Sequence, residues 1–259
     1  MDENTAPPAA DSDRVVIITG AGGAIGRATA QRFARDGSSV VALDINLAAA
    51  SETVKVLDGP GRHLALACDV SDRSQVDDSI SEVLAAHGRL DVLVAAAGTN
   101  RDNLVFRMSD DDWLSVIATN LTGTFYLARA CQAPMVTQRS GKIVLVSSRA
   151  ANGNRGQVNY SAAKAGLQGL MHALALELGR FGINVNAVAP GFVESEMTRR
   201  AAQRARLSFD EFKEQAASRN PRGLVGQPEH IAGVIAFLAS EDAIYVHGQT
   251  IYATGGPLG

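Results

Sequence analysis

Tyr160 and Lys164 are the two residues of this sequence whose types and spacing most directly suggest chemistry. They lie four residues apart in a stretch expected to be helical, and side chains at i and i+4 are neighbours on one helix face. A tyrosine hydroxyl, with a pKa of about 10, transfers protons poorly at neutral pH unless a nearby cation favours its phenolate. Lys164 would supply that cation. A tyrosine and a lysine with this spacing also occur by chance as a surface pair. A catalytic role for the two residues is therefore supported only by the other motifs of the sequence.

A glycine-rich turn near the start of the chain is the second motif. The apolar run Val15–Thr19 is typical of a buried strand, and a helix is expected from Ile25 onward. In a dinucleotide site, small residues let the backbone approach the pyrophosphate, and the helix N-terminus attracts its charge. The candidate contacts are Gly20, Gly22, Gly23, Ala24, Ile25 and Gly26. A tight turn without a ligand is the structural alternative.

The spacing of these glycines resembles that of a known family. From Thr19 the sequence fits T-G-x-x-x-G-x-G, except that Ala24 stands at the middle glycine. Together with Tyr160 and Lys164, this motif resembles the short-chain dehydrogenase/reductase family, and the likeness extends over 14–256. The resemblance implies hydride transfer between a nicotinamide cofactor and a carbonyl or secondary alcohol carbon. Within the family, the segment 98–113 is most similar to 3-oxoacyl-[acyl-carrier-protein] reductases.

The resemblance also implies the remaining catalytic positions. Asn120 matches an asparagine that, in the family, sits in a distorted helix and positions a water beside the lysine. Ser148 matches the serine that orients the substrate carbonyl when counted from the preceding strand, whereas Ser147 has the more usual separation from Tyr160. In reduction, Tyr160 would donate the proton and Ser148 would bind the developing oxyanion. Lys164 would lower the pKa of Tyr160 and hold the ribose, and Asn120 would complete a relay to solvent.

Asp44 is the residue expected to select the cofactor. It ends the second predicted strand, 24 residues after Gly20, where a dinucleotide fold places the acid that binds the adenosine ribose hydroxyls. A carboxylate there would repel the 2′-phosphate of NADP, and the loop 21–25 holds no Arg or Lys to offset the repulsion. The sequence therefore favours NAD(H) and leaves NADP(H) open. The alternative is that Asp44 only caps the next helix.

The resemblance extends the cofactor site to three further segments. Where the family usually has Asn-Asn-Ala-Gly, this sequence has Ala-Ala-Ala-Gly, ending at Gly98. Both asparagines are therefore absent, and with them a side-chain hydrogen bond that would fix the strand end. Asp69 and Val70 are similar to the pair that contacts the adenine in the family, and a simple turn aspartate is the alternative role for Asp69. In the loop against the nicotinamide, the backbone of Val193 would hold the carboxamide. The implied contacts are Asp69, Val70, Ala96, Ala97, Gly98, Pro190, Gly191, Val193 and Ser195, together with Tyr160 and Lys164.

Short apolar runs alternate with longer amphipathic stretches, which predicts an α/β fold: one Rossmann-type, doubly wound parallel sheet with helices on both faces. Seven strands are expected at Val15–Thr19, Ser39–Asp44, Leu64–Ala67, Val92–Ala95, Lys142–Ser147, Asn184–Ala189 and Thr250–Tyr252. Helices are expected at Ile25–Asp36, Leu47–Leu57, Arg73–His87, Asp111–Val136, Val158–Phe181 and Pro228–Ala239. Residues 1–13 are expected to be a flexible tail, and 14–259 a single dinucleotide-binding catalytic domain with a lid near 195–221.

Composition indicates which kinds of binding partner this protein is not expected to have. The net charge of −3 gives no basic footprint for nucleic acid or for an anionic membrane. No apolar run approaches the length of a membrane span. Cys68 and Cys131 fit no metal or redox spacing, so no metal is expected. These features together predict a cytoplasmic protein.

The substrate depends on the lid. Its arginines Arg199, Arg200, Arg204 and Arg206 could meet the phosphates of coenzyme A or of an acyl carrier protein, but a solvated helix face explains them equally well. Of the two basic residues that dock a carrier in the similar reductases, Arg139 matches one, while Phe181, beside Arg180, replaces the other. The resemblance also implies a homotetramer.

Two enzymatic hypotheses follow, with one from another class. A 3-oxoacyl thioester reductase is favoured by the segment after Gly98, and an NAD-dependent secondary alcohol or cyclic ketone dehydrogenase by Asp44. A non-catalytic dinucleotide sensor would keep the glycine loop but lose Tyr160 or Lys164. Since both are present, the enzymatic hypotheses are preferred.

Overall fold

Seven parallel strands form one sheet in the order β3-β2-β1-β4-β5-β6-β7. The structure, a computed structural model, describes residues 14–257, so the expected tail 1–13 lies outside the described residues. The strands are β1 (Val15–Thr19), β2 (Ser39–Asp44), β3 (Leu64–Ala67), β4 (Val92–Ala95), β5 (Gly141–Val146), β6 (Ile183–Pro190) and β7 (Thr250–Ala253). The order reverses between β1 and β4, which is the switch point of a doubly wound sheet. The predicted fold class is confirmed.

Alternate residues of each strand enter two separate hydrophobic cores, because successive side chains point to opposite faces of a sheet. Ile17 and Leu43 belong to one core, and Ile18 and Ala42 to the other. Helices cover both faces, so the strands are mostly apolar on both sides. This double burial explains why short Val/Ile runs were recognisable as strands.

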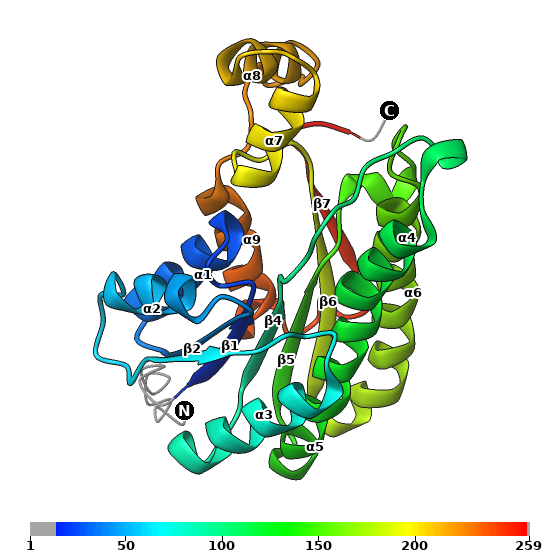
Figure 1. Cartoon of the computed structure of the whole chain (residues 1–259). Helices are drawn as coiled ribbons and strands as arrows, with labels where there is room; N and C mark the ends of the chain where they lie inside the picture. The colour runs from blue at the N-terminus through cyan, green and yellow to red at the C-terminus, as the bar shows by residue number, and fades with distance from the viewer. Residues whose placement is uncertain (1–13, 258–259) are drawn as a thin grey trace.

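The two helical layers are visible on either side of the sheet (Figure 1). One layer contains α1 (Ala24–Arg35), α2 (Leu47–Lys55) and α9 (Pro228–Leu238). The other contains α3 (Arg73–His87), α5 (Gly123–Gln138) and α6 (Val158–Leu178). The short helix α4 (Asp110–Ile117) leads into α5 and packs against α6. The layers hold the carboxyl ends of the strands at one edge, where the loops that carry the candidate residues meet.

The structure divides two of the predicted helices. The helix expected at Asp111–Val136 consists of α4, a π-helical turn at Ala118–Thr122, and α5. The helix expected to reach Phe181 ends at Leu178 and continues as a 3₁₀ turn, Gly179–Phe181. Further 3₁₀ turns are Val105–Arg107, Arg149–Asn152 and Glu241–Ala243. Strand β5 ends at Val146, one residue earlier than predicted, so Ser147 lies just beyond the strand.

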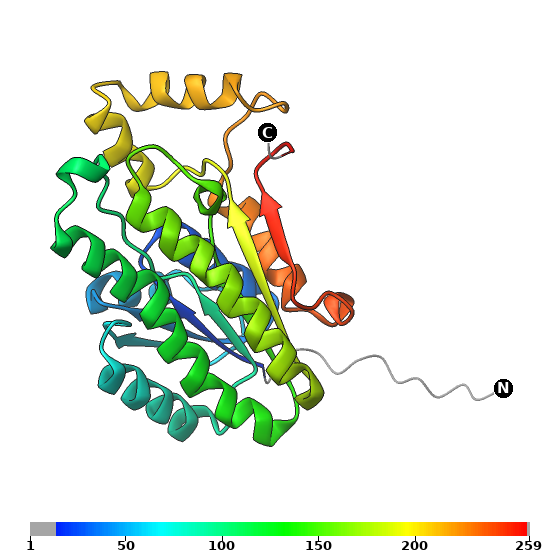
Figure 2. The ribbon, with the colours of Figure 1, turned by 90° about the vertical axis from the view of Figure 1, so that its right-hand side faces the viewer.

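The segment expected to be a lid contains two helices, α7 (Glu196–Arg204) and α8 (Phe209–Ser218). They extend beyond the carboxyl end of β6, outside both helical layers (Figure 2). Ser195 and Ser208 begin these helices with capping boxes, in which the serine side chain and the third helical residue satisfy each other's backbone amides. The sequence prediction gave neither helix its own bounds.

Among residues 14–257, no helix is both long and apolar enough to cross a membrane.

Candidate active site

The loops after β1, β4, β5 and β6 meet at the carboxyl edge of the sheet, beside the N-terminal half of α6. Ligands of open α/β sheets bind at this edge, at the point where the strand order reverses. Here the edge joins the glycine turn after Thr19, the segment after Ala95, and the two serines after Val146. The fold therefore brings together segments that are distant in the sequence.

Ser148 lies beside the Tyr160 phenol. Burial raises the pKa of Tyr160 to about 12, a hydrogen bond with the Ser148 side chain opposes that rise, and the charge of Asp102 adds to it. Ser147, by contrast, is buried, and its Oγ donates a hydrogen bond to the carbonyl oxygen of Lys164 at 2.9 Å. Of the two serines, Ser148 is thus the one beside the phenol. At neutral pH the phenol holds its proton.

Lys164 lies beneath Tyr160 in the core of the molecule. Its Nζ donates a hydrogen bond to the Val146 carbonyl oxygen at 2.8 Å and lies 5.5 Å from the centroid of the Tyr160 ring. Burial lowers the pKa of this ammonium to about 8. Burial, Ser148 and Asp102 are the causes that set the pKa of Tyr160 in this structure, and a lowering of that pKa by Lys164 stays a prediction.

Asn120 occupies the π-helical turn, and the distorted helix expected there is observed. Its Nδ2 donates to the carbonyl oxygens of Thr99 at 2.8 Å and Val116 at 2.9 Å. Its Oδ1 is buried and has no hydrogen-bond partner among the described residues. A Cβ at Gly98 would lie 2.7 Å from this Oδ1 and 3.5 Å from Lys164 Nζ. Gly98 therefore keeps open the space between an unsatisfied acceptor and a cation, which suits a bridging water or a ligand hydroxyl.

The glycine turn fits a dinucleotide pyrophosphate. Gly20 has a φ of +66°, and a Cβ there would lie 2.8 Å from Ala97 Cα, so only glycine suits this position. Gly23 caps α1 without a side-chain hydrogen bond, and the first turn of α1, which begins with Ala24 and Ile25, contains no acidic residue. The Ala21, Gly22 and Gly23 amides are hydrogen-bonded within the chain, so the first turn of α1, at the positive end of the helix dipole, is the part that would meet an anion.

Asp44 holds the glycine turn against the end of β2. Its Oδ2 accepts a hydrogen bond from the Gly22 amide, and its Oδ1 accepts one from the Asn46 amide, each at 3.0 Å. The cap of α2 is Asn46, whose side chain accepts from the Ala49 amide at 3.3 Å. The alternative in which Asp44 caps this helix is therefore wrong. A carboxylate lies beside the glycine turn, where an adenosine ribose would be recognised.

The end of β4 is fixed without the asparagines that the family usually has there. The Ala97 amide donates to Thr19 Oγ1 at 3.1 Å, which ties the end of β4 to the end of β1. Ala96 packs against the core formed with α1 and α9. Thr19 of the neighbouring strand therefore provides a hydrogen bond that fixes the end of β4, in place of the one expected to be lost with the asparagines.

Asp69 and Val70 follow β3. Asp69 Oδ1 accepts hydrogen bonds from the Ser71 amide at 2.9 Å and from the Ser71 hydroxyl at 2.7 Å, which is the turn role considered as the alternative. Val70 is buried and packs against Gly123 at the start of α5. An adenine contact at this pair stays a prediction.

The loop after β6 connects the sheet to α7, in the segment expected to be a lid. Pro190 ends β6, and the Gly191 amide donates to the Ala253 carbonyl at 3.1 Å. Val193 forms an isolated β-bridge with Gly226. The two hydrogen bonds of this bridge involve the Glu194 amide and the Phe192 carbonyl, not the backbone of Val193. The Ser195 side chain is engaged in the cap of α7. The loop is therefore well ordered by backbone contacts, and a nicotinamide contact through Val193 stays a prediction.

Comparison with known proteins places this geometry in a family. Residues 20–257 match the family described as enoyl-(acyl carrier protein) reductase. The chain is 44% identical to a 3-oxoacyl-[acyl-carrier-protein] reductase of Thermotoga maritima over 94% of this chain and 97% of that protein. It is 41% identical to a (3R)-3-hydroxyacyl-CoA dehydrogenase of Homo sapiens over 93% of this chain and 94% of that protein. The chain belongs to the short-chain dehydrogenase/reductase family.

Solved structures agree with this assignment. A levodione reductase matches with a TM-score of 0.89 and 32% identity, over 95% of this chain and 97% of that one. This short-chain dehydrogenase/reductase is therefore an oxidoreductase that acts on CH–OH groups with a nicotinamide dinucleotide. The fit of the glycine turn, the open space at Gly98 and the acid at the end of β2 agrees with that cofactor class.

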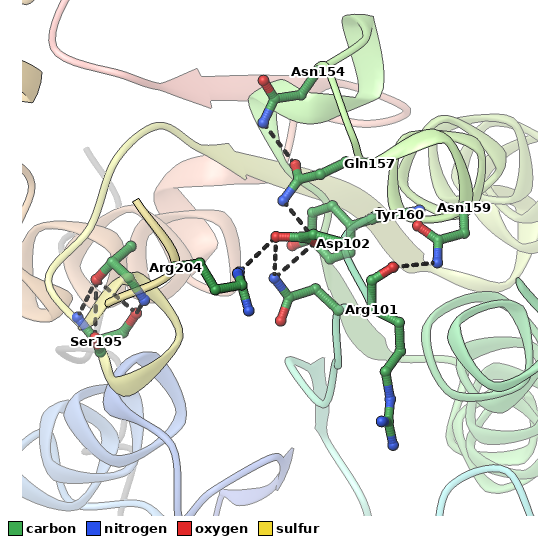
Figure 3. Close-up of polar contacts among 10 residues, drawn as sticks. Arg101, Asp102, Asn154, Gln157, Asn159, Tyr160, Ser195 and Arg204 are labelled. Carbon is green, nitrogen blue, oxygen red and sulfur yellow. Dashed lines mark hydrogen bonds and ion pairs between the residues drawn. The ribbon is translucent and has the colours of Figure 1, made fainter. Parts of the chain in front are cut away.

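The enzyme also contains a polar cluster beside Tyr160 that sequence reasoning missed (Figure 3). Asp102 accepts hydrogen bonds from Asn100, Gln157 and Arg204, which come from three different segments. The sequence offered a signal, because Asp102 lies in the segment that resembles 3-oxoacyl-[acyl-carrier-protein] reductases. Its partners could not be found without the fold.

The lid arginines have partners within the chain. The guanidinium of Arg199 lies 4.1 Å from the centroid of the Phe209 ring. Arg200 forms an ion pair with Glu196 at 3.4 Å, and Arg204 one with Asp102 at 2.6 Å. These contacts account for three of the four arginines without a phosphate ligand. Among the described residues, no group of three or more His, Cys, Asp or Glu side chains is arranged to hold a metal ion.

Proposed function

We propose that this enzyme reduces a 3-oxoacyl thioester, carried by coenzyme A or by an acyl carrier protein, to the 3-hydroxyacyl thioester. The observation that carries the proposal is the placement of Ser148 beside a Tyr160 phenol that retains its proton at neutral pH. This is a proton donor paired with a hydrogen-bond donor, as reduction of a carbonyl requires. The names of the relatives at 44% and 41% identity support the thioester substrate.

The catalytic roles follow from the positions of four side chains. The bound nicotinamide supplies the hydride to the carbonyl carbon. Tyr160 donates its proton to the carbonyl oxygen, and Ser148 donates a hydrogen bond to the same oxygen as negative charge develops there. Lys164 binds the ribose hydroxyls from below the phenol, next to the space that Gly98 keeps open. Asn120 Oδ1 holds a water in that space, through which the proton of Tyr160 is replaced from solvent.

We propose that the remaining predicted contacts bind the cofactor and that NAD(H) is preferred. The Asp44 carboxylate beside the Gly22 amide supports this preference, because it would repel a 2′-phosphate. Asp44→Asn keeps an acceptor for that amide but removes the charge. We expect the ratio of kcat/KM for NADPH to that for NADH to rise about tenfold in this variant, the effect of roughly 1.4 kcal/mol. The matched control is Asp58→Asn, an exposed aspartate beyond α2, which should leave the ratio unchanged.

The decisive experiment is the initial rate of acetoacetyl-CoA reduction by the purified enzyme, with NADH and NADPH in parallel. Turnover with NADH well above NADPH would support both the thioester substrate and Asp44 as the cofactor selector. Turnover with NADPH alone would retain the substrate and contradict the NAD(H) preference. No turnover with either cofactor would overturn the thioester proposal.

A second candidate is an NAD-dependent dehydrogenase of a secondary alcohol or cyclic ketone. The likeness to a levodione reductase, at a TM-score of 0.89, favours it. The same assay with a cyclic diketone in place of acetoacetyl-CoA separates the two candidates. The better substrate, judged by kcat/KM, identifies the substrate class.

An acyl carrier protein is proposed as the alternative carrier of the thioester. Arg139 Nη2 donates to the Arg180 carbonyl at 3.2 Å, and the Arg180 guanidinium lies 4.7 Å from the centroid of the Phe181 ring. The Arg139 guanidinium thus reaches the backbone of the turn that carries Arg180, although Phe181 replaces one of the expected basic residues. Comparing kcat/KM for acetoacetyl-carrier protein with that for acetoacetyl-CoA tests this partner, and Arg180→Gln should lower only the former.

We further propose that 14–259 acts as one catalytic domain and assembles as a homotetramer in the cytoplasm. Leu176 is 88% exposed and Ile244 is 60% exposed, so apolar side chains of α6 and of the segment before β7 are available for subunit contacts. Both cysteines are free and buried, as suits a reducing compartment. Light scattering that gave a monomer would contradict the tetramer, and cell fractionation tests the location.

A further inference from the structure

Asp102 receives hydrogen bonds from three segments of the chain (Figure 3). Arg204 Nη2 lies 2.6 Å from its Oδ2, although the two residues are 102 positions apart in the sequence. Gln157 Nε2 donates to Oδ1 at 3.1 Å, and Asn100 Nδ2 lies 3.0 Å from both carboxylate oxygens. The Asp102 side chain is only 19% exposed, so this carboxylate is largely enclosed by its donors.

The backbone on either side of Asp102 is fixed to the start of α6. The Asn103 amide donates to the Gly156 carbonyl at 2.8 Å, and Asn159 Nδ2 donates to the Arg101 carbonyl at 2.9 Å. Asn159 Oδ1 also accepts from the Tyr160 amide at 2.7 Å. One buried asparagine thus ties both the segment containing Asp102 and the tyrosine to the same point, and the carboxylate has a defined position relative to the phenol.

The lid is attached much more loosely. Ala202 is the one buried residue of α7, and α8 contains none. Among the described residues, the other ion pairs of the lid join positions within 194–213: Arg200 with Glu196, and Lys213 with Glu194 and Asp210. The Arg204–Asp102 pair is different, because it joins the last residue of α7 to the opposite wall of the site.

We propose that Asp102 is a positioning residue that latches α7 onto the wall of the active site through Arg204. The latch sets the width of the substrate opening beneath the lid. When it is released, Asp102 stays in place, because Gln157, Asn100 and the backbone contacts to α6 hold it there. Arg204 leaves with the lid.

The latch also couples the lid to the proton donor. The Asp102 charge contributes to the raised pKa of Tyr160, and Arg204, whose Nη2 lies 2.6 Å from that carboxylate, offsets the charge while the two groups are paired. The charged groups that face the phenol and this carboxylate are Lys164 from α6 and Arg204 from α7. An open lid leaves Asp102 uncompensated, so Tyr160 holds its proton more tightly. Proton donation is therefore easiest when the lid is closed over the substrate.

Hydrogen exchange of the intact enzyme, without substrate, tests the latch by itself. Asp102→Asn and Arg204→Gln should each speed amide exchange in 196–218 by about threefold to fivefold, as expected for the loss of one partly exposed ion pair. The double variant should exchange no faster than either single variant. The matched control, Asp210→Asn, removes a carboxylate that pairs with Lys213 inside the lid at 3.0 Å and should leave exchange in 196–204 unchanged. Unchanged exchange in both single variants would overturn the proposal.

The charge coupling has a separate readout that a purely structural role would not produce. The pKa of Tyr160, followed by NMR through its ring ζ-carbon, should fall in Asp102→Asn and rise in Arg204→Gln. A shift in the same direction in both variants would overturn the coupling. Kinetics complete the test: both variants should raise the KM for acetoacetyl-CoA by about threefold to fivefold.

The kinetic readout rests on the proposed function, whereas exchange and titration do not. If the unaltered enzyme does not reduce acetoacetyl-CoA, the thioester proposal fails, and exchange and titration still decide whether Asp102 latches the lid. If the unaltered enzyme is active and lid exchange is unaffected by the variants, the latch fails and the proposed function stands.

Discussion

Helix α6 and the lid helices form two walls of the same site but are held in opposite ways. Seven residues of α6 are buried, including the polar Asn159 and Lys164, whereas α7 buries one residue and α8 none. The polar groups of α6 are fixed by buried hydrogen bonds, and those of the lid by caps and surface ion pairs. A proton donor must be positioned to a fraction of an ångström, whereas a lid must open at little cost.

This difference predicts that changes on the α6 side affect kcat and that changes in the lid affect KM. Catalysis depends on interactions that are stronger in the transition state, and a lid that contacts the substrate throughout contributes mainly uniform binding. The following substitutions test the comparison in order of decreasing effect.

Tyr160→Phe should have the largest effect. The variant lacks the proton donor but retains the ring that packs over Lys164, so kcat should fall about 10²- to 10⁴-fold while NADH affinity changes little. Steady-state kinetics and fluorescence titration of NADH measure the two quantities. Tyr245→Phe is the control, because Tyr245 is fully exposed. Near-normal turnover in Tyr160→Phe would remove Tyr160 from the mechanism.

Gly98→Ala should be the next most damaging change. The new Cβ would lie 2.7 Å from Asn120 Oδ1 and would enter the space beside Lys164 Nζ. We expect a loss of stability of about 1–3 kcal/mol from overpacking and at least roughly a tenfold fall in kcat. Gly169→Ala in α6 is the matched control, because no atom lies within 4 Å of its added Cβ. Equal effects of the two variants on kcat would mean that the space at Gly98 has no catalytic role.

Lys164→Met should show how much burial of the Lys164 ammonium lowers the free energy of unfolding. Burial lowers the pKa of Lys164 from 10.5 to about 8, so between these values the unfolded chain binds a proton that the folded protein does not. The stability of the unaltered enzyme should therefore rise with pH through this window, relative to the variant, by roughly 3 kcal/mol. Denaturant unfolding of both proteins at several pH values measures the difference. If the difference in unfolding free energy between the two proteins did not change with pH, burial would not lower the pKa of Lys164, and this prediction would be wrong.

Phe212→Ala, on the lid side, should have the smallest effect. The Phe212 ring in α8 packs against Phe192 with centroids 5.5 Å apart, so its loss should loosen the lid by about 0.5–1.5 kcal/mol. We expect KM for acetoacetyl-CoA to rise a few fold and kcat to stay within about twofold. Phe237→Ala, in α9 outside the lid, is the control for loss of an aromatic ring. A fall in kcat larger than the rise in KM would contradict the division of roles between the two walls.

Much of the fold could be predicted because its signals are local. The strands β1 to β4 have the bounds that the sequence predicted, since each is a short apolar run that ends at turn residues. The spacing of Tyr160 and Lys164 follows from helix periodicity alone. The choice between Ser147 and Ser148 was not local, because it depended on contacts with α6: Ser147 Oγ bonds to the Lys164 carbonyl, whereas Ser148 lies beside Tyr160.

The tertiary structure decided the contacts between distant segments. Whether Lys164 Nζ binds the phenol or the Val146 carbonyl depends on how α6 packs against β5, and no local pattern encodes that choice. Likewise, Thr19 replaces a missing asparagine because β1 and β4 are neighbours in the sheet.

The sequence by itself determined the strands, most of the helices, the cofactor class and the chemical types of the candidate catalytic residues, because periodicity, glycine spacing and side-chain chemistry are properties of short segments. Only the tertiary structure decided which side chains meet. The pairing of Arg204 with Asp102 across 102 positions is one such meeting, because the packing of the whole chain determines it.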